Sequence, residues 1–238
     1  MDDNLKRKLA NYRTPERVIE LIRATNIVFL VGVSAAGKDT VINQLDKNSS
    51  GYHLIVSHTT RPPRHNHGVL EQNGVEYHFI DLRTAETMLD EGGFVEAKLV
   101  HGNVYGTSVA EIQMAHDEGK IAITEIEVQG IAEYKRVADN VLPIFLLPPD
   151  FKTWQGRFHK RYDADKINRD DMKKRMETAR DELVEALSRD YYQYVVNKDL
   201  NETVRIVGEI AHGNLSTEKN QQAKVVARQL LDQLATLL

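Results

Sequence analysis

The sequence contains no cysteine, and this absence excludes disulfide bonds, thiolate metal sites and cysteine nucleophiles. Long apolar runs are also missing: none approaches the length of a membrane span, and the N-terminal stretch lacks the apolar segment of a signal peptide. Basic residues are in no excess, because 31 Lys and Arg face 35 Asp and Glu, for a formal net charge of −4. We therefore expect a cytoplasmic protein with no membrane and no nucleic-acid partner.

The 238 residues, 41% of them hydrophobic, are enough for one or two compact domains. Short apolar runs alternate with helical patterns along the chain. We predict strands over residues 27–31, 52–56, 121–126, 141–147 and 194–196, and helices over residues 108–118, 129–138 and 170–189. This alternation indicates an α/β fold with a five-stranded parallel sheet covered on both faces, whose ligands bind at the carboxyl ends of the strands.

Both ends of the chain read as helical additions. A helix is predicted from Thr14 on, with the Thr14 hydroxyl as its cap, Pro15 at its first position and an apolar face of Val18, Ile19, Leu21 and Ile22. We interpret residues 1–25 as an addition to the sheet core. Within residues 213–238 a second helix carries an apolar face of Val226, Leu230, Leu234 and Leu237. Such a face is expected to dock on its own domain, with contact between two copies as the alternative.

The most informative stretch follows the first strand. Residues 32–38 match the spacing of a phosphate-binding loop, G-x-x-x-x-G-K, which turns backbone N–H groups toward one point at the start of a helix. Lys38 places a cation beside the phosphates. Asp39 stands where a Ser or Thr usually binds Mg²⁺, and Thr40 comes one place later. The alternative is an ordinary glycine-containing turn between strand and helix.

Two regions interrupt the alternation and read as insertions on the ligand side of the sheet, residues 57–107 and residues 152–176. The first begins SHTTRPPR, in which Arg61 and Arg64 lie close to two prolines. Guanidinium groups bind phosphate oxygens in pairs, so this segment can hold a second phosphate. Taken alone, this segment is better interpreted as a solvated basic loop.

Together these motifs resemble the guanylate kinase family. The blocks that carry the resemblance occur in the family's order: SHTTRPPR at 57–64, NGVEYHFI at 73–80, FVEAKLVHGNVYGTS at 94–108, ITEIEVQG at 123–130, IFLLPPD at 144–150 and YQYVVNKDL at 192–200. The resemblance implies a P-loop NTPase-type domain over residues 26–212, with an inserted GMP-binding subdomain and a mobile lid. Its parts would be a core of 26–56, 108–151 and 177–212, the subdomain 57–107 and the lid 152–176.

The resemblance also implies which residues bind GMP. The phosphate would be held by Arg61, Arg64, Tyr77 and Tyr105, and the guanine would be read by Ser57, Glu96, Thr107 and Glu127. Guanine presents N1–H and a 2-amino group as adjacent donors, and one carboxylate can accept from both. Adenine has an acceptor at N1 and would leave that carboxylate unpaired.

For ATP the matching residues are Gly32, Ser34, Ala35, Ala36, Gly37, Lys38, Asp39, Thr40 and Asn197. Mg²⁺ would be held by Asp39 and Glu125, and the groups acting on the transferred phosphate would be Lys38, Arg157, Arg161 and Arg175. The chain departs from the family in having Glu at positions 125 and 127, where Asp is usual, and Lys at 198 in place of an acid. Its lid is longer and contains Arg169. The loop after Arg64 is also longer, and its His65 and His67 are expected to be solvated, with a metal site as the alternative.

We therefore expect Mg²⁺-dependent transfer of a phosphoryl group from ATP to GMP. One alternative is a related P-loop kinase acting on another phosphate-bearing substrate, such as a ribose bisphosphate precursor, which Asp39 favours and the guanine-reading residues disfavour. The other is a non-catalytic guanylate-kinase-like interaction module, which Lys38 and the arginines disfavour. The oligomeric state, monomer or homodimer, is left open.

Overall fold

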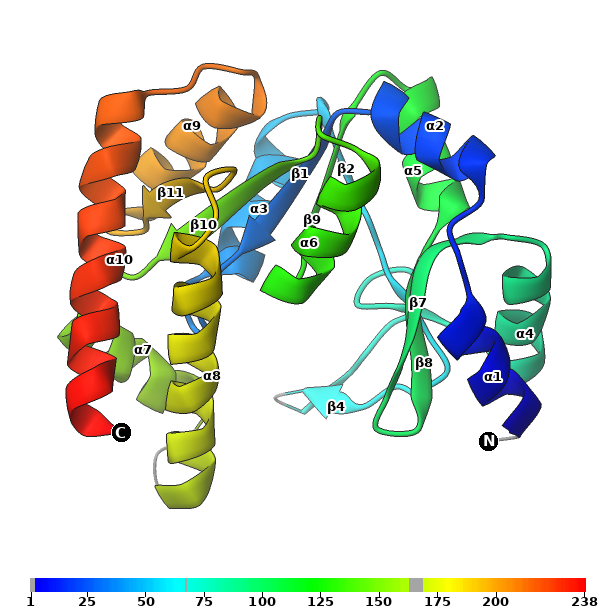
Figure 1. The fold of residues 1–238 in the computed structure, drawn as a ribbon, viewed down its shortest axis with the longest axis horizontal. Helices are drawn as coiled ribbons and strands as arrows, with labels where there is room; N and C mark the ends of the chain where they lie inside the picture. The colour runs from blue at the N-terminus through cyan, green and yellow to red at the C-terminus, as the bar shows by residue number, and fades with distance from the viewer. Residues whose placement is uncertain (1–2, 67, 163–168) are drawn as a thin grey trace. The chain divides into compact units, whose positions relative to one another are not determined.

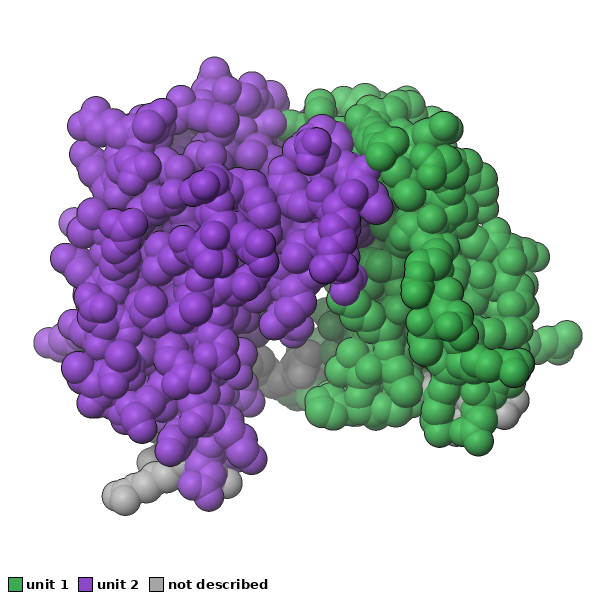
Figure 2. Space-filling view, in the orientation of Figure 1, with its two compact units in different colours: residues 1–26, 53–122 green, residues 27–52, 123–238 purple. Residues whose placement is uncertain are grey.

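The computed structural model describes residues 3–66, 68–162 and 169–238. His67 and the middle of the predicted lid lie outside these residues. The chain divides into two compact units (Figure 2). Unit 1 comprises Met1–Asn26 and His53–Ala122, and unit 2 comprises Ile27–Tyr52 and Ile123–Leu238.

The predicted five-stranded parallel sheet is confirmed, with the strand order β11-β10-β1-β9-β2 (Figure 1). Its strands are β1 (Ile27–Val31), β2 (Tyr52–Leu54), β9 (Ile121–Glu125), β10 (Leu142–Leu147) and β11 (Gln193–Val196). All five residues of β1 are buried, as its continuous apolar run requires for a strand covered on both faces. β1 pairs with β10 in the register Val28↔Leu142. Consequently the loop after Val31 opens at the carboxyl edge of the sheet.

Helices cover both faces of this sheet. They are α3 (Lys38–Asn48), α6 (Val128–Val137), α7 (Phe151–Tyr162), α8 (Arg169–Leu187), α9 (Leu200–Ala211) and α10 (Thr217–Leu237). In the view of Figure 1, α6 lies in front of the sheet and α3 behind it. α3 contacts α9, while α8 contacts α6 and α10. None of the helices in the described part of the chain is long and apolar enough to cross a membrane.

The C-terminal helix α10 packs on its own unit, as predicted, along α8 and strand β11. Leu230 and Leu234 are buried, but Leu237 is 56% exposed, so its predicted place in the docking face is wrong. Ala223 and Ala227 complete that face. Small residues at these positions let α10 lie close to its neighbours.

Unit 1 contains a four-stranded sheet of order β6-β3-β8-β7. Its strands are β3 (His58–Thr59), β6 (His78–Phe79), β7 (Phe94–Val100) and β8 (Asn103–Ser108), next to a hairpin of β4 (His65–Asn66) and β5 (Val69–Leu70). The helices are α1 (Asp3–Asn11), α2 (Glu16–Ala24), α4 (Leu82–Asp90) and α5 (Val109–Asp117). The longest pairing is the antiparallel β7–β8 ladder.

The N-terminal helices α1 and α2 lie in unit 1, and their interpretation as a helical extension stays a prediction. α1 lies beside α4 and β7 in Figure 1. Its Leu5 and Leu9 are buried in one apolar cluster with Ala85, Leu89, Phe94 and Val104. The predicted cap of α2 is wrong: Pro15 is the N-cap residue of this helix, so Thr14 lies one residue too far from the helix N–H groups. The Thr14 hydroxyl instead donates to the carbonyl of Val95, 2.8 Å away.

Candidate active site

The loop between β1 and α3 has the backbone that its glycines predict. Gly32 has φ +139°, and a Cβ there would lie 2.3 Å from the carbonyl oxygen of Leu146. Gly37 has φ +98°, and its Cβ would lie 2.5 Å from Nδ2 of Asn197. Ala35 takes φ +64°, a strained conformation for a residue with a side chain. Since Gly37 is the N-cap of α3 and has no side chain, the first N–H groups of this helix are left for an anion.

Two side chains from distant elements support the loop. Asn197 is buried and donates from Nδ2 to the carbonyl of Ala36 (2.9 Å), while its Oδ1 accepts from the Thr203 hydroxyl (3.2 Å). Trp154 on α7 donates from its indole nitrogen to the carbonyl of Ser34, 2.8 Å away. Asn197 thus holds the loop in shape, and direct contact of Asn197 with ATP stays a prediction. Trp154 and Thr203 carried no signal in the sequence.

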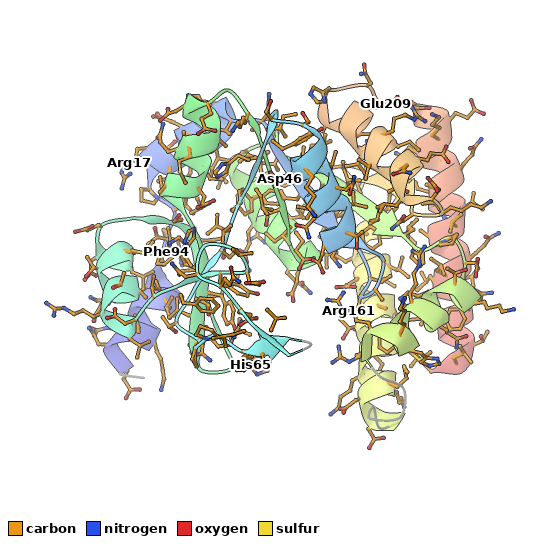
Figure 3. The ribbon with its side chains drawn as sticks, turned by 180° about the vertical axis from the view of Figure 1, so that it is seen from behind. Arg17, Asp46, His65, Phe94, Arg161 and Glu209 are labelled. Atoms are coloured by element: carbon orange, nitrogen blue, oxygen red, sulfur yellow. The ribbon has the colours of Figure 1, made fainter. Side chains whose placement is uncertain are left out.

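Charged groups gather beside this loop in unit 2. Lys38 Nζ donates to the carbonyl of Gly32 (2.8 Å) and lies 3.9 Å from Oε2 of Glu125. Arg161 of α7, labelled in Figure 3, lies 3.7 Å from Oδ2 of Asp39. Lys38, Glu125 and Arg161 line a cavity of about 300 Å³, together with Gly32, Ser34, Ile126, Glu127 and Glu182.

Glu125, which lines this cavity, and the neighbouring Asp39 are the carboxyl groups that suit a divalent cation. Burial raises the pKa of Glu125, and the neighbouring Asp39 carboxyl raises that pKa further, against the opposing effect of Lys38. Two carboxyl groups that disfavour each other's charge are relieved by a cation between them. Mg²⁺ prefers such oxygens and takes its remaining ligands from water and substrate phosphates. The residues therefore fit the ion.

Glu182 of α8 is the charged residue lining this cavity that sequence reasoning missed. Burial raises its pKa to about 7, the charge of Glu127 adds to this, and Lys38 opposes it. In the sequence it is one acid on a highly charged helix, so nothing marked it.

The three predicted lid arginines lie in different surroundings. Arg161 lines the cavity. Arg157 donates from Nη2 to the carbonyl of Asn197 (2.9 Å), and its buried Nη1 has no hydrogen-bond partner among the described residues. Arg175 is exposed on α8, and Thr40 is exposed in the first turn of α3. The structure thus brings one of the three arginines to Lys38.

Unit 1 brings together the residues predicted to bind a second phosphate. Arg61 is 5% exposed, and its guanidinium lies 5.2 Å from the Tyr77 ring centre. Its Nε donates to the Tyr105 hydroxyl, 3.0 Å away. Glu71 accepts from Nη1 (2.7 Å) and Nη2 (3.0 Å) of Arg61 and from the backbone N–H of Arg64 (2.8 Å). Sequence reasoning missed Glu71, because its partner Arg61 is ten residues away and the path of the long loop between them could not be predicted.

The residues predicted to read guanine are divided between the units. Glu96 on β7 stands opposite Thr107 on β8, and its Oε1 accepts from the Thr107 N–H at 3.1 Å. Ser57 lies in the same unit, where its carbonyl accepts from the N–H of His78 (2.9 Å). Glu127 is in unit 2, at the N-cap of α6.

A group of half-buried histidines lies in the same unit. Glu111 accepts from His53 and from His78, each 3.0 Å away. His58 stacks near His78, and burial, with a smaller effect of His78, lowers the pKa of His58 to about 4. Ser57 directly precedes His58, and Tyr77 directly precedes His78. The histidine group therefore holds the backbone next to these two residues of the predicted GMP site. His65 is exposed on β4.

A phosphate loop after the first strand of a five-stranded parallel sheet defines a P-loop NTPase-type core. The sequence model of the guanylate kinase family matches residues 24–213, and the chain belongs to that family. A guanylate kinase from Neisseria gonorrhoeae is 34% identical over 190 residues, covering 80% of this chain and 87% of that protein. One from Cupriavidus metallidurans is 31% identical over 211 residues, covering 89% and 94%.

Among solved structures, the crystal structure of guanylate kinase from Anaplasma phagocytophilum is similar to this fold with a TM-score of 0.56 and 26% identity. It covers 82% of this chain and 90% of that chain.

Proposed function

We propose that this protein transfers the terminal phosphoryl group of ATP to GMP, forming ADP and GDP. Family membership supports this reaction. One structural observation supports this reaction independently of family membership. Unit 1 contains both the cluster of Arg61, Tyr77 and Tyr105 and the Glu96–Thr107 pair. A kinase for a ribose bisphosphate precursor has no use for a base reader, and an interaction module has no use for Lys38.

ATP binding is assigned to unit 2. Its phosphates lie against the N–H groups at the start of α3, with the cation of Lys38 beside them. Asn197 and Trp154 keep the loop in the required shape through its carbonyl groups. Asp39 and Glu125 are assigned to hold Mg²⁺, which neutralises the charge of the phosphates when it is bound.

GMP binding is assigned to unit 1. Arg61 and Arg64 supply charge for the phosphate, and the hydroxyls of Tyr77 and Tyr105 donate to it without adding charge that product release must overcome. Glu96 accepts from N1–H and the 2-amino group of guanine, and Ser57, Thr107 and Glu127 complete the polar surroundings. On this assignment residues 57–107 are the GMP-binding subdomain of a domain spanning 26–212, residues 152–176 are its lid, and 1–25 and 213–238 are helical extensions.

Phosphoryl transfer then needs little chemistry from side chains. The attacking oxygen of GMP is already anionic, so no general base is required. Negative charge spreads over the oxygens of the group in transfer, and Lys38 and Arg161 stabilise it. Arg157 and Arg175 are assigned to the same role when the lid closes and excludes water. We place this reaction in the cytoplasm, the compartment that holds both nucleotides.

A coupled assay for ADP formation with GMP, AMP, UMP and a ribose bisphosphate precursor as acceptors tests the proposal. We expect activity with GMP. Glu96→Gln places an amide donor against the donors of guanine and should lower kcat/KM for GMP by about 10²-fold or more, with little change in KM for ATP. A strong preference for the sugar phosphate would contradict the proposal, as would no activity with any acceptor.

A further inference from the structure

The strand that carries Glu96 is irregular next to this residue. In the β7–β8 ladder Phe94 pairs with Ser108 and Glu96 pairs with Thr107. Val95 is therefore one extra residue on β7, and within the described residues of this ladder it has no partner on β8. This is a β-bulge, which rotates the strand and changes the direction of the following side chain. Gly106 on β8 permits the close approach, since a Cβ there would lie 2.5 Å from the Glu96 carbonyl oxygen. The direction of Glu96 therefore depends on the bulge.

The N-terminal segment supplies hydrogen bonds to both carbonyls of the bulge. The Tyr12 hydroxyl donates to the carbonyl of Phe94 at 2.5 Å, and the Thr14 hydroxyl donates to the carbonyl of Val95 at 2.8 Å. Phe94 is fully buried and Val95 is 2% exposed. Buried carbonyls that a bulge takes out of its ladder need other donors, and without them the bulge is free to shift its register.

The segment that offers these hydroxyls is firmly attached on both sides. Before Tyr12, Lys8 forms ion pairs with Glu86 (2.8 Å) and Asp90 (2.6 Å) of α4. After Thr14, Arg17, labelled in Figure 3, donates to the carbonyls of Glu91 (2.9 Å) and Gly92 (3.1 Å), in the turn before β7. Tyr12 and Thr14 lie outside the part of the chain that matches the family, which begins at residue 24.

We propose that Tyr12 and Thr14 are positioning residues for base recognition, because their hydroxyls fix the β-bulge that aims Glu96 at guanine. This inference rests on the proposed role of Glu96. It gives the N-terminal helices a part in specificity in addition to their part in the apolar cluster with Leu5 and Leu9.

The test compares GMP with inosine monophosphate, which has the N1–H of guanine but lacks its 2-amino group. A correctly aimed Glu96 accepts from both donors of GMP and from one donor of the analogue, so the ratio of their kcat/KM values reports its direction. Thr14→Val removes the hydroxyl and should lower this ratio by about tenfold, and Tyr12→Phe with Thr14→Val should lower it further. KM for ATP should not change.

Two controls separate aiming from general stability. Thr14→Ser keeps the hydroxyl and should keep the wild-type ratio. Thr25→Val removes a hydroxyl of the same segment that donates to the carbonyl of Leu21, 2.7 Å away and outside β7. It should lower Tm without changing the ratio. If Thr14→Val also lowers Tm while the ratio stays at the wild-type value, the segment is only structural and the inference is wrong.

Glu96→Gln measured in parallel distinguishes this failure from failure of the proposed site. If Glu96→Gln reduces the ratio and the Tyr12 and Thr14 variants do not, the inference alone fails. If Glu96→Gln leaves the ratio unchanged, Glu96 does not read the base, and the inference falls with that assignment.

Discussion

Glu71 holds the guanidinium of Arg61 with two hydrogen bonds, to Nη1 at 2.7 Å and to Nη2 at 3.0 Å. Both side chains are buried, and this paired acceptor raises the pKa of Arg61. Glu71 also accepts from the backbone N–H of Arg64 (2.8 Å). One carboxylate thus fixes both arginines to which we assign the phosphate of GMP. A buried arginine that is fixed in this way loses little freedom when its ligand arrives.

Loss of the Glu71 carboxylate should therefore affect stability and GMP binding together. Glu71→Gln leaves the Arg61 charge buried without its counter-ion, and we expect the free energy of unfolding to fall by about 3 kcal/mol. KM for GMP should rise by about tenfold, equivalent to ~1.4 kcal/mol, because Arg61 and Arg64 are no longer held in place. Denaturant unfolding and steady-state kinetics measure the two effects.

Glu76→Gln is the matched control for Glu71→Gln. Glu76 accepts from the backbone N–H of Gln72 (2.7 Å) in the same loop but is exposed. Glu76→Gln should leave KM for GMP unchanged. An unaltered KM in Glu71→Gln as well would show that the arginines do not depend on Glu71.

Lys38 should matter for turnover and little for folding. Its Nζ reaches the Gly32 carbonyl in a partly open cavity, so Lys38→Ala should keep the fold. We expect kcat to fall on the order of 10²-fold or more, as for other lost donors to a transition state. Lys47→Ala, in the last turn of the same helix, should keep wild-type turnover. Normal kcat in a folded Lys38→Ala protein would contradict the assignment of residues 32–40.

Local patterns predicted those parts of the molecule that neighbouring residues determine. The apolar run 27–31 became β1, and the glycine spacing that follows it became a loop with positive φ at Gly32 and Gly37. In these segments one periodicity or one conformational requirement decides the structure. Strand and helix ends differ from the predicted ends by at most two residues, because hydrogen bonding at the ends depends on neighbouring elements.

Contacts between distant segments could not be predicted in this way. The Arg61–Glu71 pair depends on the path of a loop, and the Asn197–Ala36 bond joins residues 161 positions apart. Thr14 was predicted as a cap because its type and place suit one, but in the fold its hydroxyl donates to the carbonyl of Val95. Sequence patterns predicted the residues of the candidate site, while the contacts that support these residues depend on tertiary packing.

The raised pKa of Glu182, about 7, predicts a specific pH dependence of stability. The folded protein binds the proton more tightly than the unfolded chain, whose pKa is near 4.5. This contribution to stability is complete below about pH 4.5 and is lost as the pH rises through about 7. The Gln of Glu182→Gln cannot ionise. The Tm of this variant should therefore rise relative to the Tm of the wild type as the pH is raised from 5 to 8. Glu177 is on the same helix but outside the lining of the cavity, so Glu177→Gln should show no such relative rise in Tm. An equal rise in both variants would contradict the raised pKa of Glu182.

Asp39 stands at the chain's clearest departure from the phosphate-loop pattern. Its carboxyl neighbours that of Glu125 and lies 3.7 Å from Nη2 of Arg161. A carboxylate beside ATP would repel the phosphates unless a cation lay between them, so we assign Asp39 to Mg²⁺, directly or through a bound water, and Thr40 to an ATP phosphate.

Asp39→Asn should then raise the Mg²⁺ concentration that gives half-maximal activity, while KM for GMP stays the same, because an amide oxygen is a weaker ligand than a carboxylate. Asp39→Ser should restore much of the wild-type Mg²⁺ dependence, since a hydroxyl is the usual ligand at this position. The opposite assignment is that Asp39 serves only to hold Arg161. In that case both variants would lower kcat at saturating Mg²⁺ and leave the half-saturation point where it is. A Mg²⁺ titration of the three proteins at fixed ATP and GMP decides between the two roles.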